Sequence, residues 1–331
     1  MRFGLSLPHY DFSLRGVRPI HFEAVAEHAV RAEELGFDTV WMSDHFFYSL
    51  ARYGSGEELL GSLEPLSTLA GLAVRTRRVR LGTLVLGAPF RHPSVLAKSA
   101  TTIDVLSNGR LDLGIGAGWY RDEFEAFGYP FGEVGDRFAA LEDAVELLDA
   151  LLPGGPVTRD IGTVRLVEAT NRPEPSQRPR PPIWVGAKGG DRSLRLVARY
   201  ADGWNSVWRW TPEAYADRMR RARELADGVG RDPATLRFSV GLYTVVGEDE
   251  RDLRARWDAL AAWMPRVLDG QSIDEWRTDA LVGTVDQARE RVAAFEDIGV
   301  EEIVVAPAPL PFAIPDPSMV ELLAEAVIGV G

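Results

Sequence analysis

Short apolar runs alternate with longer segments of helical period along the chain. The first run, FGLSLP at residues 3–8, precedes a segment from His21 to Leu35 whose apolar residues recur every three or four positions. Gly36 follows and suits the left-handed position that often ends a helix. The alternation predicts strands at residues 3–8, 39–43, 79–86, 110–118, 182–187, 203–208, 236–246 and 302–307. It predicts helices at residues 21–35, 65–75, 93–106, 137–152, 192–200, 212–227, 249–264, 285–298 and 317–328.

Repeated βα units with apolar strands predict an α/β fold, a (β/α)8 TIM barrel. Eight parallel strands close a barrel that has no exposed edge. An open, doubly wound sheet is the alternative, but its two mononucleotide-binding halves are not visible. We expect one domain over residues 1–331, with surface excursions after the fourth and seventh strands. These two excursions cover residues 119–135 and 265–280, respectively. A third excursion, at residues 153–182, has the alternation of a hairpin.

Composition and charge exclude several classes of protein. The chain carries 49 acidic and 37 basic side chains, a net charge of −12. This balance disfavours nucleic acid and anionic membranes as partners, because both require a basic surface. The sequence contains no cysteine, which excludes disulfides and thiolate chemistry. No signal peptide or membrane-spanning run is recognisable, so we expect a cytoplasmic protein that binds a small molecule and forms a homodimer or higher oligomer.

Functional side chains of such a barrel gather where strands end and loops begin. Asp44 and His45 directly follow the strand TVWMS. A histidine can exchange a proton, and an adjacent carboxylate can hold its charged form or bind a cofactor. A turn cap at Asp44 and a structural ring at His45 fit the same spacing. The GxSxG and HExxH motifs are absent, so we expect neither a serine hydrolase nor a metal site.

Two glycine-rich stretches follow later strands. LGIGAGWY, at residues 113–120, lacks the helix that a dinucleotide fingerprint requires, so its glycines suit either close approach of a flat ring or a tight turn. In WVGAKGGDRS, Gly189 and Gly190 open a helix whose N–H groups, with Lys188, suit a phosphate. A solvated loop is the alternative. Trp204 and Trp208 share a strand face and would either wall a pocket or pack in the core or an interface.

Together these motifs resemble the bacterial luciferase-like monooxygenase superfamily, in particular the branch that uses the deazaflavin coenzyme F420. The resemblance covers nearly the whole chain. It rests on the segments FGLSLP, GFDTVWMSDHF, RVRLGTLVLGAPFRHPSVLAKSATTIDVLSNGRLDLGIGAGWYRDEF and PPIWVGAKGGDRSLRLVARYADGWN. It implies a (β/α)8 barrel and hydride transfer by F420. FMN-using members more often carry a glutamate and two histidines at the SDHF position.

The resemblance also implies roles for individual residues. Asp44 and His45 would be catalytic and lie against the deazaflavin ring, and the third strand would end in a bulge with a cis Leu84–Val85 peptide. The cofactor-binding residues would be Asp44, Thr83, Leu84, Val85, Leu86, Gly116, Ala117, Gly118, Trp119, Gly186, Ala187, Lys188, Gly189 and Gly190. The substrate pocket would include Pro8, His9, Phe46, Trp204 and Trp208.

Trp119 departs from the pattern of the sugar-phosphate dehydrogenases in this branch, which place their general acid, a glutamate, at this position. A sugar phosphate is therefore a less suitable substrate, and we expect a more apolar pocket. The predicted function is F420-dependent hydride transfer to or from a small organic substrate. The alternatives are an FMN-dependent two-component monooxygenase and a non-catalytic flavin- or deazaflavin-binding protein. The loops expected to form the pocket are residues 8–18, 45–61, 119–135 and 265–278.

Overall fold

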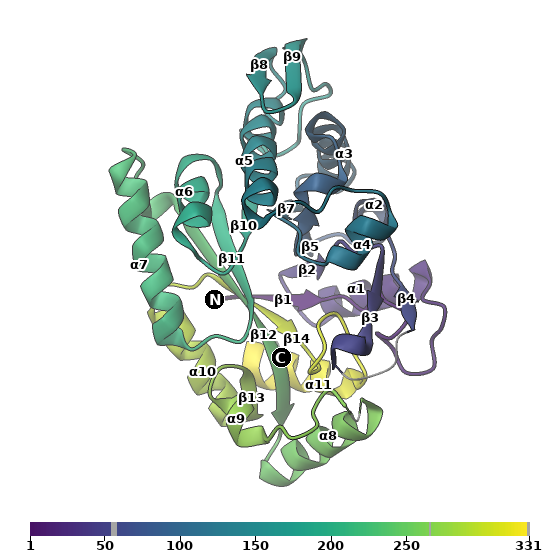
Figure 1. Ribbon diagram of the computed structural model, residues 1–331. Coiled ribbons are helices and arrows are strands. Elements are labelled where there is room, and N and C mark those ends of the chain that lie inside the picture. Colours follow the sequence, from purple (N-terminus) through teal and green to yellow (C-terminus); the bar gives the residue numbers. More distant parts are fainter. Residues whose placement is uncertain (54–57, 265, 330–331) are drawn as a thin grey trace. The chain divides into compact units, whose positions relative to one another are not determined.

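A computed structural model describes residues 1–53, 58–264 and 266–329 (Figure 1). The chain divides into two compact units. Unit 1 comprises Met1–Leu63, Ser206–Arg218 and Phe238–Gly331, and unit 2 comprises Glu64–Asn205 and Met219–Arg237. One domain over residues 1–331 stays a prediction.

Unit 1 is built on parallel strands. Strand β1 pairs with β2 and β14, β14 pairs with β12, and β12 pairs with β13. The strands are β1 (Arg2–Ser6), β2 (Thr39–Met42), β12 (Arg237–Gly247), β13 (Leu281–Thr284) and β14 (Glu302–Ala306). The helices are α1 (Phe22–Glu34), α8 (Glu250–Trp263), α9 (Ile273–Arg277), α10 (Val285–Asp297) and α11 (Pro317–Leu322), which continues into the π-helical turn η4 (Leu323–Ile328). A small antiparallel hairpin, β3 (Phe47–Ser49) and β4 (Leu59–Gly61), flanks the 3₁₀ turn η1 (Leu50–Tyr53).

Unit 2 repeats this construction. Strand β7 pairs in parallel with β5, β6 and β10, and β10 pairs with β11. The strands are β5 (Arg80–Thr83), β6 (Leu86–Gly87), β7 (Leu111–Gly116), β10 (Ile183–Gly186) and β11 (Gly203–Trp208), whose residues from Ser206 onward belong to unit 1. The helices are α2 (Pro65–Arg75), α3 (Pro93–Leu106), α4 (Arg121–Ala126), α5 (Val134–Leu151), α6 (Asp191–Tyr200) and α7 (Pro212–Gly228), whose residues up to Arg218 belong to unit 1. The 3₁₀ turns are η2 (Ala88–Phe90) and η3 (Pro233–Thr235). An antiparallel hairpin, β8 (Val157–Ile161) and β9 (Val164–Ala169), follows α5.

The order of strands and helices is that of a (β/α)8 barrel, as the sequence predicts. Every residue of β2, β7 and β14 is buried, which is typical of parallel strands covered on both faces. Gly36 ends α1 with a φ of 81°, also as predicted. The predicted strand at residues 79–86 is divided into β5 and β6.

Several short elements were not predicted. They are α4 in the first excursion, α9 in the second, the strand β13 and the hairpin β3–β4. Each of these helices and strands has six or fewer residues. Segments this short do not show a clear hydrophobic periodicity. The hairpin expected within residues 153–182 is present as β8–β9. Residue 265, where the second excursion was expected to begin, lies outside the described residues.

Each unit buries one carboxylate near the amino-terminal ends of its strands. In unit 1, Glu302 accepts a hydrogen bond from Trp41 Nε1 at 3.0 Å, and its other oxygen lies 3.2 Å from Arg2 Nη2. In unit 2, Asp112 accepts from Trp184 Nε1 at 3.1 Å and from Arg80 Nε at 2.5 Å. Buried carboxylates need such partners, so these clusters tie strands together at the ends opposite the predicted site residues.

Candidate active site

Asp44 and His45 follow the end of β2, where the sequence predicts catalytic side chains. Asp44 is buried, with 7% of its surface exposed, and His45 is half-buried. The Ser62 hydroxyl donates a hydrogen bond to the backbone carbonyl of His45. This contact fixes the backbone next to the imidazole while leaving the ring nitrogens to other interactions.

Beneath this turn lies a buried hydrogen-bonded chain formed by His9, Ser43 and Tyr10. His9 Nδ1 lies 2.9 Å from the Leu7 carbonyl, and because a carbonyl can only accept, Nδ1 carries the proton. His9 Nε2 is then an acceptor, and the Ser43 hydroxyl donates to it at 3.1 Å. The Tyr10 hydroxyl in turn donates to Ser43 Oγ. The direction of all three hydrogen bonds thus follows from one neutral imidazole.

Burial keeps that imidazole neutral. His9 has no exposed surface, and desolvation lowers its pKa from 6.5 to about 4, with a smaller lowering contribution from His45. Hydrogen bonds with Leu7 and Ser43 oppose the shift but do not reverse it. His9 is therefore a proton acceptor in a structural network at neutral pH.

Aromatic rings surround His45 and His9. The Tyr48 ring lies edge-on to His45 with centroids 5.4 Å apart, and Tyr10 lies 6.3 Å from His45. Phe312 packs edge-on against His9 at 5.0 Å and against Trp208 at 5.6 Å. These rings exclude water from the buried side of the histidines.

In unit 2, the predicted bulge lies between β5 and β6. The Leu84–Val85 peptide is cis, as predicted, and a second non-proline cis peptide, Val207–Trp208, was not predicted. The Thr83 hydroxyl bonds to both the carbonyl and the N–H of Gly114 at 2.8 Å. Leu84 and Leu86 are buried, whereas Val85 is partly exposed.

The glycines of β7 and β10 make room for this bulge. A Cβ at Gly114 would lie 1.9 Å from the Thr83 carbonyl oxygen, and a Cβ at Gly116 or Gly186 would lie 2.8 or 2.7 Å from Val85. For the LGIGAG glycines the sequence predicts either close approach of a flat ring or a tight turn. In the structure, Val85 is a neighbour within the chain itself that requires the absence of a side chain at Gly116.

The loop before α6 has the features of an anion site. Gly189 has a φ of 75°, and Gly190 caps α6 with open space around its Cα. The N–H groups of the first helical turn point out of the helix start. Lys188 is exposed at this loop, and partial desolvation of its ammonium group lowers its pKa. The Trp204 indole, fully buried, donates to the Ala187 carbonyl at 2.8 Å and braces the loop.

Ala117, Gly118 and Trp119 form the loop between β7 and α4. Gly118 has a φ of 73°, and Phe124 packs where its Cβ would lie. Trp119 is 49% exposed and tilts against Tyr120 with ring centroids 5.4 Å apart. An indole here carries no titratable group, so this position cannot supply a general acid.

The predicted site residues thus form two groups, one in each unit. Unit 1 contains Pro8, His9, Asp44, His45, Phe46 and Trp208, and unit 2 contains the bulge, both glycine loops and Trp204. No role was predicted for Ser43, Tyr10 or Phe312. Ser43 and Tyr10 adjoin predicted residues in sequence, but Phe312 lies about 300 positions from His9 and has no local signal. Within the described residues, no cluster of three or more metal-ligating side chains occurs.

Several known proteins resemble this chain in sequence or in fold. The sequence matches the luciferase-like monooxygenase family over residues 1–302. An F420-dependent glucose-6-phosphate dehydrogenase from Amycolatopsis mediterranei is 34% identical over 84% of this chain and 83% of its own length. A phthiodiolone/phenolphthiodiolone dimycocerosates ketoreductase from Mycobacterium kansasii is 32% identical over 83% of this chain and 88% of its own length. The crystal structure of monooxygenase RslO1 from Streptomyces bottropensis has a TM-score of 0.78 and 27% identity, with 99% of each chain covered.

The fold is that of a (β/α)8-barrel protein, and the polar residues Asp44 and His45 follow its strand β2. The chain belongs to the luciferase-like monooxygenase family.

Proposed function

We propose that this protein is an F420-dependent oxidoreductase that transfers hydride between the deazaflavin and a small organic substrate. The observation that carries the proposal is the Asp44–His45 pair at the end of β2, in a chain 34% identical to an enzyme named for its F420 dependence. The monooxygenase match is less similar in sequence, at 27% identity.

The residues present fit the coenzyme. Its phosphate suits the open helix start at Gly190, where Lys188 adds a positive charge. Ala117 lies between Gly116 and Gly118, and Ala187 directly follows Gly186, so a flat ring system can approach the backbone closely at both places. When bound, F420 supplies a ring carbon that accepts or releases hydride. Hydride chemistry of this kind leaves the protein to orient the substrate and to move a proton.

His45 is the residue best suited to move that proton. It is half-buried at a strand end, and its backbone is held by Ser62. His9 is locked as a neutral acceptor by Leu7 and Ser43, so it positions the turn that carries Ser43 and Asp44 without itself exchanging protons at neutral pH. Asp44 would stabilise the charged form of His45 or bind a polar edge of the coenzyme.

The substrate class we propose is a neutral organic carbonyl compound or alcohol. By the family resemblance, Trp119 stands where sugar-phosphate dehydrogenases carry a glutamate as general acid, and an indole cannot take that role. One relative is a ketoreductase by name, which is consistent with carbonyl chemistry.

Titrations with purified F420 and with FMN test the cofactor. We expect F420 to bind and FMN to bind weakly or not at all, read from the absorbance and fluorescence of each. Tight FMN binding without F420 binding would support the two-component monooxygenase instead.

Turnover tests the catalytic role of His45. We expect His45→Asn to slow F420-dependent reduction of neutral carbonyl compounds by about 10²–10⁴-fold, the usual contribution of a general acid or base, with F420 affinity retained. His92→Asn is the matched control, because His92 caps α3 through its side chain and asparagine can keep that role. Cofactor binding without turnover in both the wild type and His45→Asn would favour a non-catalytic binding protein.

A further inference from the structure

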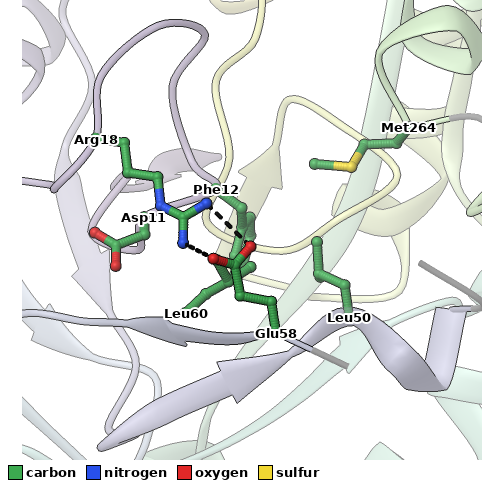
Figure 2. Close-up of a pocket in the computed structure, with 7 residues that line it drawn as sticks. All are labelled: Asp11, Phe12, Arg18, Leu50, Glu58, Leu60 and Met264. Atoms are coloured by element: carbon green, nitrogen blue, oxygen red, sulfur yellow. Dashed lines mark hydrogen bonds and ion pairs between the residues drawn. The ribbon is translucent and has the colours of Figure 1, made fainter. Parts of the chain in front are cut away.

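A cavity of about 280 Å³ lies within unit 1, and its lining includes none of the residues predicted to contact the coenzyme. Figure 2 shows its lining. Its apolar wall is formed by four side chains that are each only 6–8% exposed: Phe12, Leu50, Leu60 and Met264. Small-molecule sites have volumes of about 300–1,000 Å³ and mostly apolar linings. The cavity therefore suits a small ligand or one apolar part of a larger ligand.

Three charged side chains complete the lining. Arg18 donates two hydrogen bonds to the Glu58 carboxylate, one of them at 3.1 Å, as the dashed lines in Figure 2 show. Asp11 accepts from the backbone N–H groups of Ile20 and Gly61, both at 2.8 Å. One guanidinium and two carboxylates leave a net charge of −1 on the lining. An anionic ligand would have to compete with Glu58 for Arg18 and would also face Asp11.

Phe12 connects the wall of the cavity to the rings around His45. Phe12 stacks on Tyr10 with centroids 4.9 Å apart and contacts Tyr48 at 5.9 Å. Tyr48 is in turn the ring that lies edge-on to His45. An apolar group in the cavity would therefore contact Phe12, which reaches His45 through the Tyr48 ring. The lining also comes from segments expected to form the pocket, residues 8–18 and the described part of 45–61, together with Met264 at the end of α8.

We propose that this cavity binds the uncharged, apolar part of the substrate and selects against carboxylates and phosphates. The proposal rests on the function proposed above for the same unit, which places the reacting group of the substrate at His45. Leu60 and Phe12 would then limit the size of the apolar group that fits, and the carboxylates of Glu58 and Asp11 would repel ligands that carry a negative charge.

Methionine methyl NMR gives a local test that needs no cofactor. The chain has five methionines, and Met264→Leu identifies the Met264 signal by its loss. The probes are benzylacetone, a neutral ketone, and phenylpropionate, a carboxylate of nearly the same shape. We expect benzylacetone to shift the Met264 signal and phenylpropionate to bind about tenfold more weakly, because two nearby carboxylates repel it. Glu58→Gln should reduce the difference in affinity between benzylacetone and phenylpropionate.

A matched pair of variants localises the binding. Leu60 and Leu59 are neighbours on β4, but Leu60 is 6% exposed and lines the cavity, whereas Leu59 is 60% exposed. Leu60→Trp should fill the cavity and abolish the benzylacetone shift, and Leu59→Trp should leave it unchanged. Circular dichroism checks that both variants fold, and Leu50→Phe fills the cavity from another side if Leu60→Trp does not fold.

The outcomes separate this proposal from the proposed function. An unmoved Met264 signal, an equal shift in Leu60→Trp, or equal affinity for both probes would overturn the cavity proposal, whatever the F420 titration gives. A Met264 response in a protein that fails to bind F420 would overturn the oxidoreductase function and leave the cavity as a ligand site. If the cavity proposal and the proposed function are both correct, Leu60→Trp should raise KM for neutral ketones at least severalfold while the affinity for F420 stays the same.

Discussion

At the scale of single residues, two histidines near the end of β2 have different environments. His9 is fully buried and is held between a carbonyl and a hydroxyl. His45 is half-buried beside the edge of an aromatic ring. The sequence marks both as site residues, but only burial and hydrogen bonding distinguish a positioning residue from a candidate acid or base.

The pH dependence of stability should report on His9. Its pKa falls from 6.5 to about 4 on folding, so the unfolded chain binds the extra proton between these values. Its contribution to stability is complete above pH 6.5 and is lost as pH falls toward 4. We expect a loss of about 2 kcal/mol between about pH 7 and about pH 5, measured by urea unfolding. His9→Gln should remove that part of the pH dependence; an unchanged slope would mean that His9 is protonated in the folded protein.

At the scale of elements, the contact of β7 with the bulge after β5 depends on a missing side chain. Thr83 brackets Gly114 with two hydrogen bonds, and the Thr83 carbonyl occupies the space of a Cβ at Gly114. Gly114→Ala should therefore destabilise the protein by about 3 kcal/mol, at the upper end of ordinary overpacking costs. Thermal and urea unfolding measure this effect. Gly155→Ala is the control, since nothing lies within 4 Å of its Cβ position.

A second prediction concerns the strands of unit 1. Glu302→Leu keeps the approximate volume but leaves the Arg2 guanidinium and the Trp41 indole N–H without their carboxylate. We expect unfolding free energy to fall by about 3 kcal/mol. Glu290→Leu, at an exposed position of α10, should change it far less. Similar losses in both variants would contradict a special role for the buried carboxylate.

The elements also show which features can be predicted from sequence. Long periodic segments such as α2 and α3 have the predicted ends, because apolar spacing and a proline at the first turn are both local signals. The Leu84–Val85 cis peptide was located through the family resemblance. The network of His9, Ser43 and Tyr10 was not predicted, since it depends on side-chain rotamers across two strands. The strand β13 was not predicted because its four residues, LVGT, carry no clear alternation.

At the scale of the whole molecule, the chain is acidic. The net charge is −12, which favours solubility over contact with anionic polymers. In the part of the chain that the structure describes, no helix is both long and apolar enough to cross a membrane. The exposed apolar side chains give more information about a protein partner than the net charge does.

Self-association is the prediction that belongs to this scale. Of the ten large apolar side chains exposed among the described residues, four lie on α2 and α3, which pack together: Val74, Val95, Val105 and Leu106. Exposed apolar side chains on a pair of packed helices suit an interface between copies of a chain. We expect light scattering after size exclusion to give about 73 kDa for a dimer, twice 36.5 kDa.

Leu106→Glu, at a position 45% exposed, should shift the mass toward 36.5 kDa because a buried, unpaired carboxylate opposes association. Val229→Glu is the control, since Val229 is similarly exposed at 49% but lies beyond α7. A monomeric wild type, or equal effects of both substitutions, would show that these helices do not form an interface. A loss of turnover that follows dissociation would further indicate that the assembled form is the active enzyme.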